Sequence, residues 1–348
     1  MRPSVDVVIL HVEADPSAGP LTRATAAARL GLAERHRRGF LAAGATRVTV
    51  VSAPPDGRSF GARLRRLVRD IDEGGLVVLG SGAIPLATVA DRRELVEAAS
   101  GTRPRALTNN RYSADVVAIA RARSVLADLP DLASDNMLPR WLSETGVPVA
   151  DRRDRRRSAF DIDGPLDLVL LGGRWARPLT AGDTERVRAA IDAVRGIVAD
   201  PRAELLVAGR LSAANLAWLE RNTASRTRAL IEERGLRTRD PDQRPAVSIL
   251  GALLDRDGPG SLGEHLARLG DAAVVDSRVL LAHYAGADEA GWPTPEDRYA
   301  SDLLLPERIA DPWLRRLTSS AMNAGVPVLL GGHSLVGPGL PLALARRR

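Results

Sequence analysis

Two aspartates separated by a single residue are the side chains of this sequence best suited to metal chemistry. They are Asp161 and Asp163, within the segment 160–168. In an extended backbone, residues two positions apart point to the same face, so the two carboxylates would project together. Such a pair can hold a divalent cation through its oxygen atoms. The turn at Gly164-Pro165 would fix this pair against a helix that we expect to begin at Leu166.

A structural role for the same aspartates is the alternative. An aspartate ahead of a Gly-Pro turn commonly caps that turn or the helix behind it. Asp163 could therefore serve only as a cap, and so could Asp161. As metal ligands we favour Asp163 over Asp161.

The first half of the chain alternates predicted strands with predicted helices. Because the third strand is short and wholly apolar, it is typical of a parallel strand covered on both faces. The pattern predicts an α/β fold with a doubly wound, mainly parallel, Rossmann-like sheet that binds ligands at the carboxyl ends of its strands. The expected strands are 5–11, 47–52 and 75–80, and the expected helices are 22–43, 60–72, 89–99 and 135–142.

Polar residues follow several of these strands and are the candidate binding residues. Ser81 and Gly82 open the loop after the third strand, and Asn109, Asn110 and Arg111 lie in an expected loop over 106–115. Polar loops just beyond a sheet commonly recognise ligands, although Asn109 and Asn110 could simply form a turn.

Positive charge supplies two further candidates. Thr22 and Arg23 stand at a predicted helix start, where backbone N–H groups and a guanidinium can bind an anion. The arginines within 152–157 could lie over a phosphate-bearing ligand or form a solvated loop.

Composition excludes several mechanisms. All 49 strongly basic residues are arginine, so a Walker-A lysine, a Schiff-base lysine and a lysine general base are all absent. Cysteine is absent too, which excludes disulfides and thiolate zinc sites. No apolar run is long enough for a membrane span, and the basic clusters lack interleaved aromatic residues. We therefore expect a cytoplasmic protein that binds neither membranes nor nucleic acid.

Two segments together resemble a known enzyme group. Residues 161–168 are similar to a pattern Asp/Asn-Ile-Asp/Asn-Thr-Pro-Glu-Asp-Leu, and residues 77–86 are similar to an apolar strand that ends in a Gly-x-Asp-x-Pro-Leu loop. Both patterns occur in nucleotidyltransferases of the GT-A-like nucleotide-diphospho-sugar transferase superfamily. Cofactor-pathway members, such as molybdopterin nucleotidyltransferases and 2-phospholactate guanylyltransferase, are the most similar. The resemblance covers roughly residues 5–171.

The resemblance implies transfer of a nucleoside monophosphate from an NTP to a phosphorylated small molecule, with Mg²⁺ as cofactor. It assigns the metal to Asp163 and Asp161 and a catalytic role to Arg23. It assigns nucleotide binding to a further set: Thr22, Ser81, Gly82, Asn109, Asn110 and Arg111.

The chain also departs from the family pattern. The glycine-rich phosphate loop with its lysine is missing, and Gly82 or Ala83 stands where the family has a metal-binding aspartate. Glu13, Asp15 or Asp115 would then have to complete the metal site. A protein of the same fold that binds a nucleotide or sugar nucleotide without this reaction is therefore the alternative.

The second half resembles no family that we can name. We divide the chain into a nucleotidyltransferase-like domain over 1–174 and a mostly helical α/β extension over 175–348, and a homodimer is left open. Gly332-His333-Ser334 resembles a hydrolase nucleophile elbow but lacks its final glycine, so we expect a turn there. The expected helices are 184–198, 212–234, 261–269 and 312–324, the strands are 203–209 and 326–330, the loops are 238–246 and 293–302, and 272–283 fits either a strand or a helix.

Overall fold

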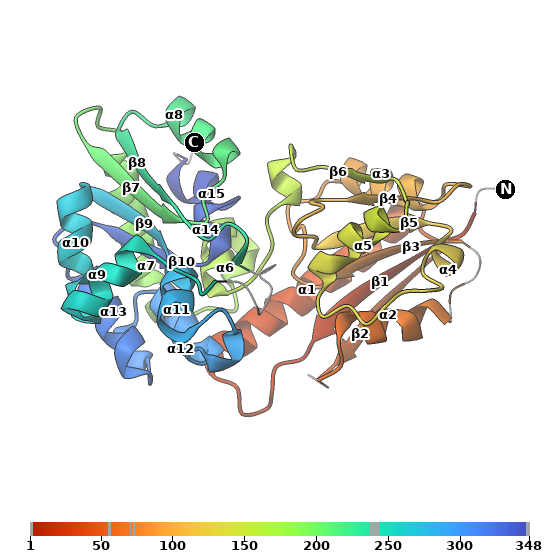
Figure 1. Cartoon of the computed structure of the whole chain (residues 1–348), viewed down its shortest axis with the longest axis horizontal. Helices are drawn as coiled ribbons and strands as arrows, with labels where there is room; N and C mark the ends of the chain where they lie inside the picture. The colour runs from red at the N-terminus through yellow and green to blue at the C-terminus, as the bar shows by residue number, and fades with distance from the viewer. Residues whose placement is uncertain (1–2, 55–56, 70, 72–73, 237–243, 346–348) are drawn as a thin grey trace. The chain divides into compact units, whose positions relative to one another are not determined.

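The computed structural model describes residues 3–54, 57–69, 71, 74–236 and 244–345 (Figure 1). Contacts divide the chain into two compact units. The first unit contains Met1–Ser17 and Ala26–Ile162, and the second unit contains Ala18–Thr25 and Asp163–Arg348. The division along the chain falls between Ile162 and Asp163, ahead of the boundary expected at 174.

The first unit is built on a six-stranded sheet with the order β2-β1-β3-β5-β4-β6. Strand β5 runs antiparallel to both of its neighbours, and the other pairings are parallel. This confirms the mixed, mainly parallel α/β sheet. The strands are β1 (Val5–Val12), β2 (Arg47–Ala53), β3 (Gly75–Gly80), β4 (Arg105–Thr108), β5 (Val116–Ala120) and β6 (Val149–Asp151).

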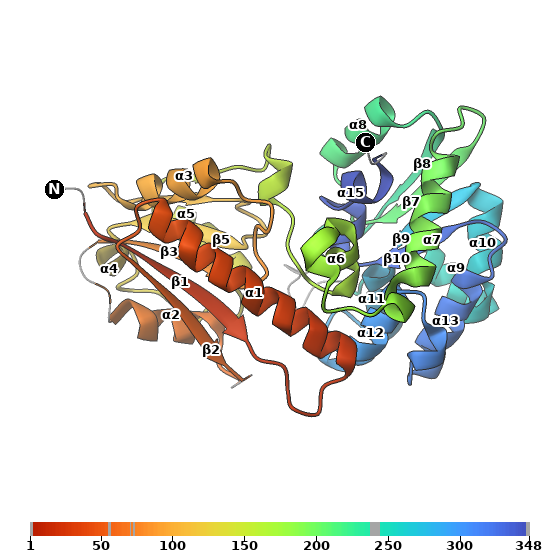
Figure 2. The same cartoon turned by 180° about the vertical axis from the view of Figure 1, so that it is seen from behind.

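Helices cover both faces of this sheet. Side chains alternate between the two faces of a strand, so neighbouring residues of β1 belong to two different cores. Val7 and Ile9 of β1 belong to one core, with Phe40 of the first helix. Val8 belongs to the other core, with Leu64 of the second helix. Figures 1 and 2 show the two faces in turn. The helices are α1 (Pro20–Ala42), α2 (Phe60–Arg69), α3 (Val89–Ala99), α4 (Ala122–Val125) and α5 (Leu138–Glu144). The residues of α1 up to Thr25 are grouped with the second unit.

The second unit contains a parallel four-stranded sheet with the order β10-β9-β7-β8. Three of its four strands, β7, β9 and β10, are almost wholly buried and apolar, as is typical of parallel strands covered by helices on both faces. The strands are β7 (Glu204–Gly209), β8 (Arg226–Ile231), β9 (Ala272–Asp276) and β10 (Val328–Gly331).

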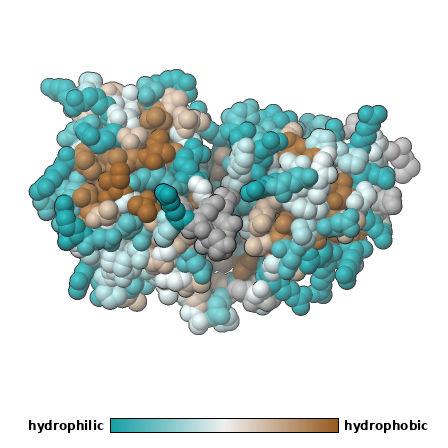
Figure 3. All heavy atoms as spheres, in the orientation of Figure 1, coloured by the Kyte–Doolittle hydropathy of each residue, from teal (hydrophilic) through white to brown (hydrophobic). Residues whose placement is uncertain are grey.

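The helices of the second unit surround this sheet (Figure 2). They are α6 (Pro165–Leu171), η3 (Gly173–Ala176), α7 (Ala181–Ile197), α8 (Ala213–Asn222), α9 (Ile249–Asp257), α10 (Leu262–Leu269), α11 (Ser277–Ala285), α12 (Pro295–Asp302), α13 (Pro312–Met322), α14 (His333–Val336) and α15 (Leu340–Leu344). Hydrophilic side chains cover much of the visible surface of both units, with hydrophobic patches between them (Figure 3).

Three sequence-based expectations are wrong. Residues 105–108 form β4 instead of entering a loop, and the helix expected over 212–234 ends at Asn222, after which 226–231 form the edge strand β8. The polar loop expected over 293–302 contains α12, whose Asp297, Ser301 and Asp302 are buried. The segment 272–283, which fitted either element, is a strand followed by a helix. Most of the loop expected over 238–246 lies outside the described residues.

No helix among the described residues is long and apolar enough to cross a membrane.

Helix α10 packs against α13 through a glycine. A Cβ added at Gly263 would lie 2.2 Å from the backbone oxygen of Ser320 and 3.0 Å from the Cα of Ala324. We expect Gly263→Ala to destabilise the second unit by about 1–3 kcal/mol, because backbone on the partner helix must move. Gly260→Ala is the control, since nothing lies within 4 Å of its added Cβ. Thermal unfolding followed by circular dichroism measures both, and equal melting temperatures would contradict this packing.

Candidate functional site

The loop Ser81–Ala87 follows β3 at the carboxyl edge of the first sheet, and its first residue is bound to the end of β1. The backbone N–H of Ser81 donates to the carbonyl of Leu10 at 2.8 Å. The Oγ of Ser81 lies 3.0 Å from Nδ1 of His11. Burial lowers the pKa of His11, and the positive charge of Arg29 lowers it further. Ser81 and His11 therefore form an uncharged polar pair at neutral pH.

The segment that contains Asp161 pairs with the same loop. Asp161 and Ala83 form an antiparallel bridge, and the N–H of Ile162 donates to the carbonyl of Gly82 at 2.9 Å. A Cβ on Gly82 would lie only 2.8 Å from the carbonyl oxygen of Ile162. The close pairing therefore requires glycine at this position. It brings Asp161 beside the loop, although its role as a metal ligand stays a prediction.

A buried histidine holds the middle of the loop. Nε2 of His36 lies 2.8 Å from the carbonyl oxygen of Ala83, and its Nδ1 lies 3.3 Å from Nε of Arg92. Burial lowers the pKa of His36 to about 3. The neutral ring then donates from Nε2 and accepts from Arg92 at Nδ1. The next residue, Ile84, is buried with a φ of 42°, which is strained for a β-branched side chain.

Arg29 is a cation at this edge that the sequence reasoning missed. Its Nε donates to the carbonyl oxygen of Ile162 at 2.6 Å and would lie 3.3 Å from a Cβ on Gly82. Arg29 stands seven residues before His36 on α1, so the two side chains share one helix face. That spacing was the available signal, because His36 and Arg29 both reach the loop Ser81–Ala87.

Asn109 is buried and makes all its bonds within the first unit. Its Nδ2 donates to Oδ2 of Asp115 at 2.7 Å and to the carbonyl oxygen of Ser158 at 3.0 Å. Its Oδ1 accepts from the backbone N–H groups of Asp115 and Val116. The turn-forming interpretation accounts for these bonds.

The neighbouring predicted residues also make local contacts. Oδ1 of Asn110 accepts from the N–H of Tyr112 at 3.0 Å. Arg111 donates to the carbonyl oxygen of Val149 at 2.6 Å and lies 3.5 Å from a carboxylate oxygen of Asp151. Their role in nucleotide binding stays a prediction.

The arginine-rich loop is anchored to helix α3. Arg152 donates to Glu94 at 2.5 and 2.8 Å, and Arg155 pairs with the same carboxylate. Arg157 binds both oxygens of Asp91 at 2.7 and 2.8 Å, and this pairing holds the pKa of Asp91 well below its usual range. These guanidinium groups therefore fasten the loop to the domain.

A carboxylate already occupies the start of helix α1. The N–H of Leu21, the N–H of Thr22 and the hydroxyl of Thr22 donate to Glu296 at 3.0, 2.9 and 2.9 Å. Arg23 donates to the carbonyl oxygen of Ala18. All these residues belong to the second unit. The anion expected at this helix start is thus supplied by the protein, and the predicted roles of Thr22 and Arg23 stay predictions.

Asp163 lies in the second unit, whereas Asp161 lies in the first. Oδ2 of Asp163 accepts from the hydroxyl of Ser334 at 3.4 Å, and its carbonyl oxygen accepts from the hydroxyl of Tyr299 at 2.9 Å. Ser334 follows β10 in the Gly332-His333-Ser334 motif and is the second residue of the short α14. This motif therefore meets the second aspartate of the Asp161-Ile162-Asp163 pattern.

Helix α6 is capped by Asp167. Its Oδ2 accepts from the backbone N–H groups of Asp163 and Gly164, both at 2.8 Å. Burial, together with the nearby Asp163 carboxylate, raises the pKa of Asp167 to about 8. The expected capping of this helix start thus comes from Asp167.

The carboxyl edge of the second sheet holds two buried ion pairs that the sequence reasoning missed. Arg210 binds Asp276 at 2.6 and 3.1 Å, and Arg278 binds Asp302 at 2.6 and 2.8 Å. Burial tends to raise the pKa of Asp276, but Arg210 and other neighbouring positive groups outweigh it and lower the pKa. Gly209, with a φ of 120°, allows the contact, because its added Cβ would lie 2.3 Å from Asp276.

These pairs lie where the connections of the second sheet diverge. From β7 the chain proceeds to β8 on one side, and from β9 it proceeds to β10 on the other side. Such switch points are common ligand sites in open α/β sheets. The signal in the sequence was a charged residue at the end of each of two apolar strands: Arg210 directly follows β7, and Asp276 is the last residue of β9.

Metal binding through protein side chains alone is not supported by the geometry. Among the described residues, no group of three His, Cys, Asp or Glu side chains is arranged to hold a metal ion. Mg²⁺ in nucleotide-binding enzymes commonly uses only one or two carboxylates together with substrate phosphates. Asp161 fits that smaller requirement in the first unit.

No family model matches the chain, and no curated protein matches it. Among solved structures, the chain shows distant similarity to Rv0371c from Mycobacterium tuberculosis H37Rv, in two crystal structures, one of them a complex with manganese. Identities are 17% and 18%, coverage is 43% of this chain and 88% of Rv0371c, and the TM-score is 0.27 for both. A likeness of this size leaves the activity to be argued from the site.

The raised pKa of Asp167 predicts a pH-dependent stability. Between pH 4 and 8 the folded protein keeps a proton that the unfolded chain releases, so Asp167 contributes less stability as the pH rises through this window, by up to about 1.4 kcal/mol per pH unit. Asp167→Asn retains an acceptor for both N–H groups and removes the titration. We expect the variant to gain stability over the parent at pH 8 but much less at pH 5. Chemical unfolding at both pH values measures this, and an identical difference at both would contradict it.

Proposed function

We propose that the chain is a nucleotidyltransferase: its first unit binds a nucleoside triphosphate at the carboxyl edge of the six-stranded sheet, and the protein transfers the nucleoside monophosphate to a phosphorylated small molecule. The proposal combines the resemblance at 77–86 and 161–168 with the geometry of the described residues.

The rigid loop Ser81–Ala87 is the observation that carries this proposal. Four partners hold it: the end of β1, His36, Arg29 through the Ile162 carbonyl, and the Asp161 segment. The buried Ile84 holds a strained backbone conformation, which proteins tend to keep at functional sites. A loop held in this way presents its backbone without further ordering when a ligand binds.

The chemistry of the edge suits a phosphate chain. Arg29 supplies the permanent positive charge that a lysine supplies in related enzymes, and its planar fork matches phosphate oxygens. Ser81 supplies a hydroxyl, and Gly82 leaves room for close approach of a ligand to the backbone. Mg²⁺ bound to the nucleotide phosphates, with Asp161 as a protein ligand, would neutralise charge that develops during transfer.

Nucleotide binding without transfer is the second candidate. Two observations favour it: no three-ligand metal group exists among the described residues, and Arg152, Arg155 and Arg157 are paired with Glu94 and Asp91. Both candidates require the same binding edge, so one binding experiment tests the common part and one activity experiment separates them.

Arg29 provides the binding test. We expect Arg29→Gln to weaken binding of an NTP with Mg²⁺ by about tenfold or more, because a charge-assisted hydrogen bond to phosphate contributes about 1.5–3 kcal/mol. Arg38→Gln on the same helix is the matched control, since this side chain is exposed and stands nine residues after Arg29, which places it on the opposite face of the helix. Isothermal titration calorimetry with each of the four NTPs measures the affinity. Equal affinities of the two variants would exclude the proposed edge.

Transfer is tested by pyrophosphate release with each NTP and a panel of phosphorylated acceptors. Mg²⁺ and Mn²⁺ are compared, the latter because Rv0371c was crystallised with manganese. A transferase releases pyrophosphate only when the acceptor is present, and Asp161→Asn abolishes the release. Tight NTP binding with no release under any condition would select the second candidate.

A further inference from the structure

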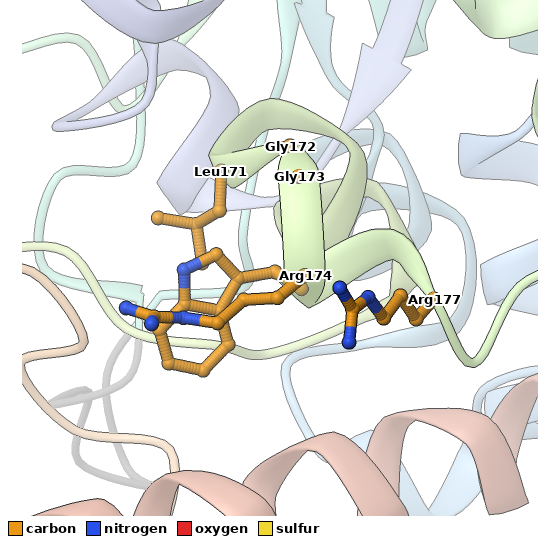
Figure 4. A pocket seen from close by; sticks show the side chains of 6 residues that line it. Leu171, Gly172, Gly173, Arg174 and Arg177 are labelled. Atoms are coloured by element: carbon orange, nitrogen blue, oxygen red, sulfur yellow. The ribbon is translucent and has the colours of Figure 1, made fainter.

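The second unit contains an open hollow of about 600 Å³ just after helix α6. The residues that line it are consecutive or nearly so: Leu171, Gly172, Gly173, Arg174, Trp175 and Arg177. Figure 4 shows the side chains of Leu171, Arg174 and Arg177 extending from this one short segment. The volume is within the range of small-molecule sites.

The backbone of the segment places its two arginines about one turn apart. Gly172 and Gly173 have φ angles of 67° and 53°, so the chain reverses after α6 through two residues in conformations that favour glycine. The 3₁₀ helix η3 follows, and the N–H of Arg177 donates to the carbonyl of Arg174. Arg177 is the residue directly after η3, so it follows Arg174 by about one 3₁₀ turn. Figure 4 shows both side chains extending toward the same side of the segment.

An aromatic ring orders one of these arginines. The guanidinium carbon of Arg174 lies 5.3 Å from the ring centroid of Trp175. Stacking uses the face of a guanidinium, whereas its N–H donors lie in its plane and can still bind an oxyanion. Across the described residues, no carboxylate lies within ion-pair distance of Arg174 or Arg177. By contrast, Arg186 on the following helix α7 pairs with Glu307 at 2.7 Å.

Stability alone does not explain this arrangement. Two like charges about one turn apart repel each other. An oxyanion bound by both guanidinium groups would replace that repulsion with attraction and would accept hydrogen bonds from both side chains. We propose that the hollow formed by residues 171–177 binds the phosphate group of a small molecule, separately from the nucleotide edge of the first unit.

Inorganic pyrophosphate is the probe, used on the full-length protein in phosphate-free buffer with EDTA at constant ionic strength. Calorimetry and tryptophan fluorescence compare the parent protein with the double variant Arg174→Gln/Arg177→Gln. Arg221→Gln is the matched control, because this exposed arginine on α8 lies outside the hollow. Trp175→Phe tests whether the fluorescence response originates at the hollow.

We expect pyrophosphate to bind the parent and the Arg221→Gln protein, with at least tenfold weaker binding to the double variant. The same loss should appear in an Arg29→Gln background, which separates this site from the nucleotide edge. The melting temperature of the double variant without ligand should stay equal or rise, since a repulsion is removed. Absence of binding to the parent, unchanged affinity in the double variant, an equal loss in Arg221→Gln, or a lower melting temperature of the double variant would each overturn the proposal.

Discussion

The pairing of residues 161–162 with the loop after β3 is the contact on which the architecture depends. The N–H of Ile162, the last residue of the first unit, donates to the carbonyl oxygen of Gly82 in the loop after β3. This hydrogen bond holds the end of the unit at the carboxyl edge of its own sheet. The pairing tolerates no side chain at Gly82. The first unit ends at Ile162, and the second unit continues from Asp163. The motif Asp161-Ile162-Asp163 therefore supplies one carboxylate to each unit.

Arginine carries all the permanent positive charge in this protein, and its planar fork determines how that charge is used. The fork binds both oxygens of a carboxylate, as Arg210 does with the buried Asp276 and Arg157 does with Asp91. Burying such an ion pair costs desolvation free energy, which offsets much of the attraction between the charges. These pairs therefore fix the arrangement of the loops more than they stabilise the fold. Arg29 also uses its guanidinium group to fix the backbone, since its Nε donates to the carbonyl oxygen of Ile162.

Local patterns predicted the alternating elements of the first unit well, because short apolar strands and capped helices are visible in the sequence. Strand β8 was missed because its residues are largely exposed at the sheet edge and carry arginines, so no apolar run marks it. Helix α12 was missed because its polar residues face inward: Asp297 accepts from the backbone of Ala310 and Asp311. The spacing of Arg29 and His36 predicts that they share one face of α1, but their proximity to the loop Ser81–Ala87 could not be predicted from the sequence, since it arises from packing of α1 on a loop far along the chain.

Eight residues near the amino terminus, Ala18–Thr25, belong to the second unit, although the rest of that unit begins at Asp163. Their N–H groups bind Glu296. During synthesis on the ribosome, this segment emerges long before its partner helix α12, and it must wait until nearly the whole chain has been made. The first unit can fold in the meantime, but the second unit cannot fold completely until α12 has been synthesised. A fragment starting at Asp163 would lack part of its own domain, so truncation at the unit boundary would not yield two independent proteins.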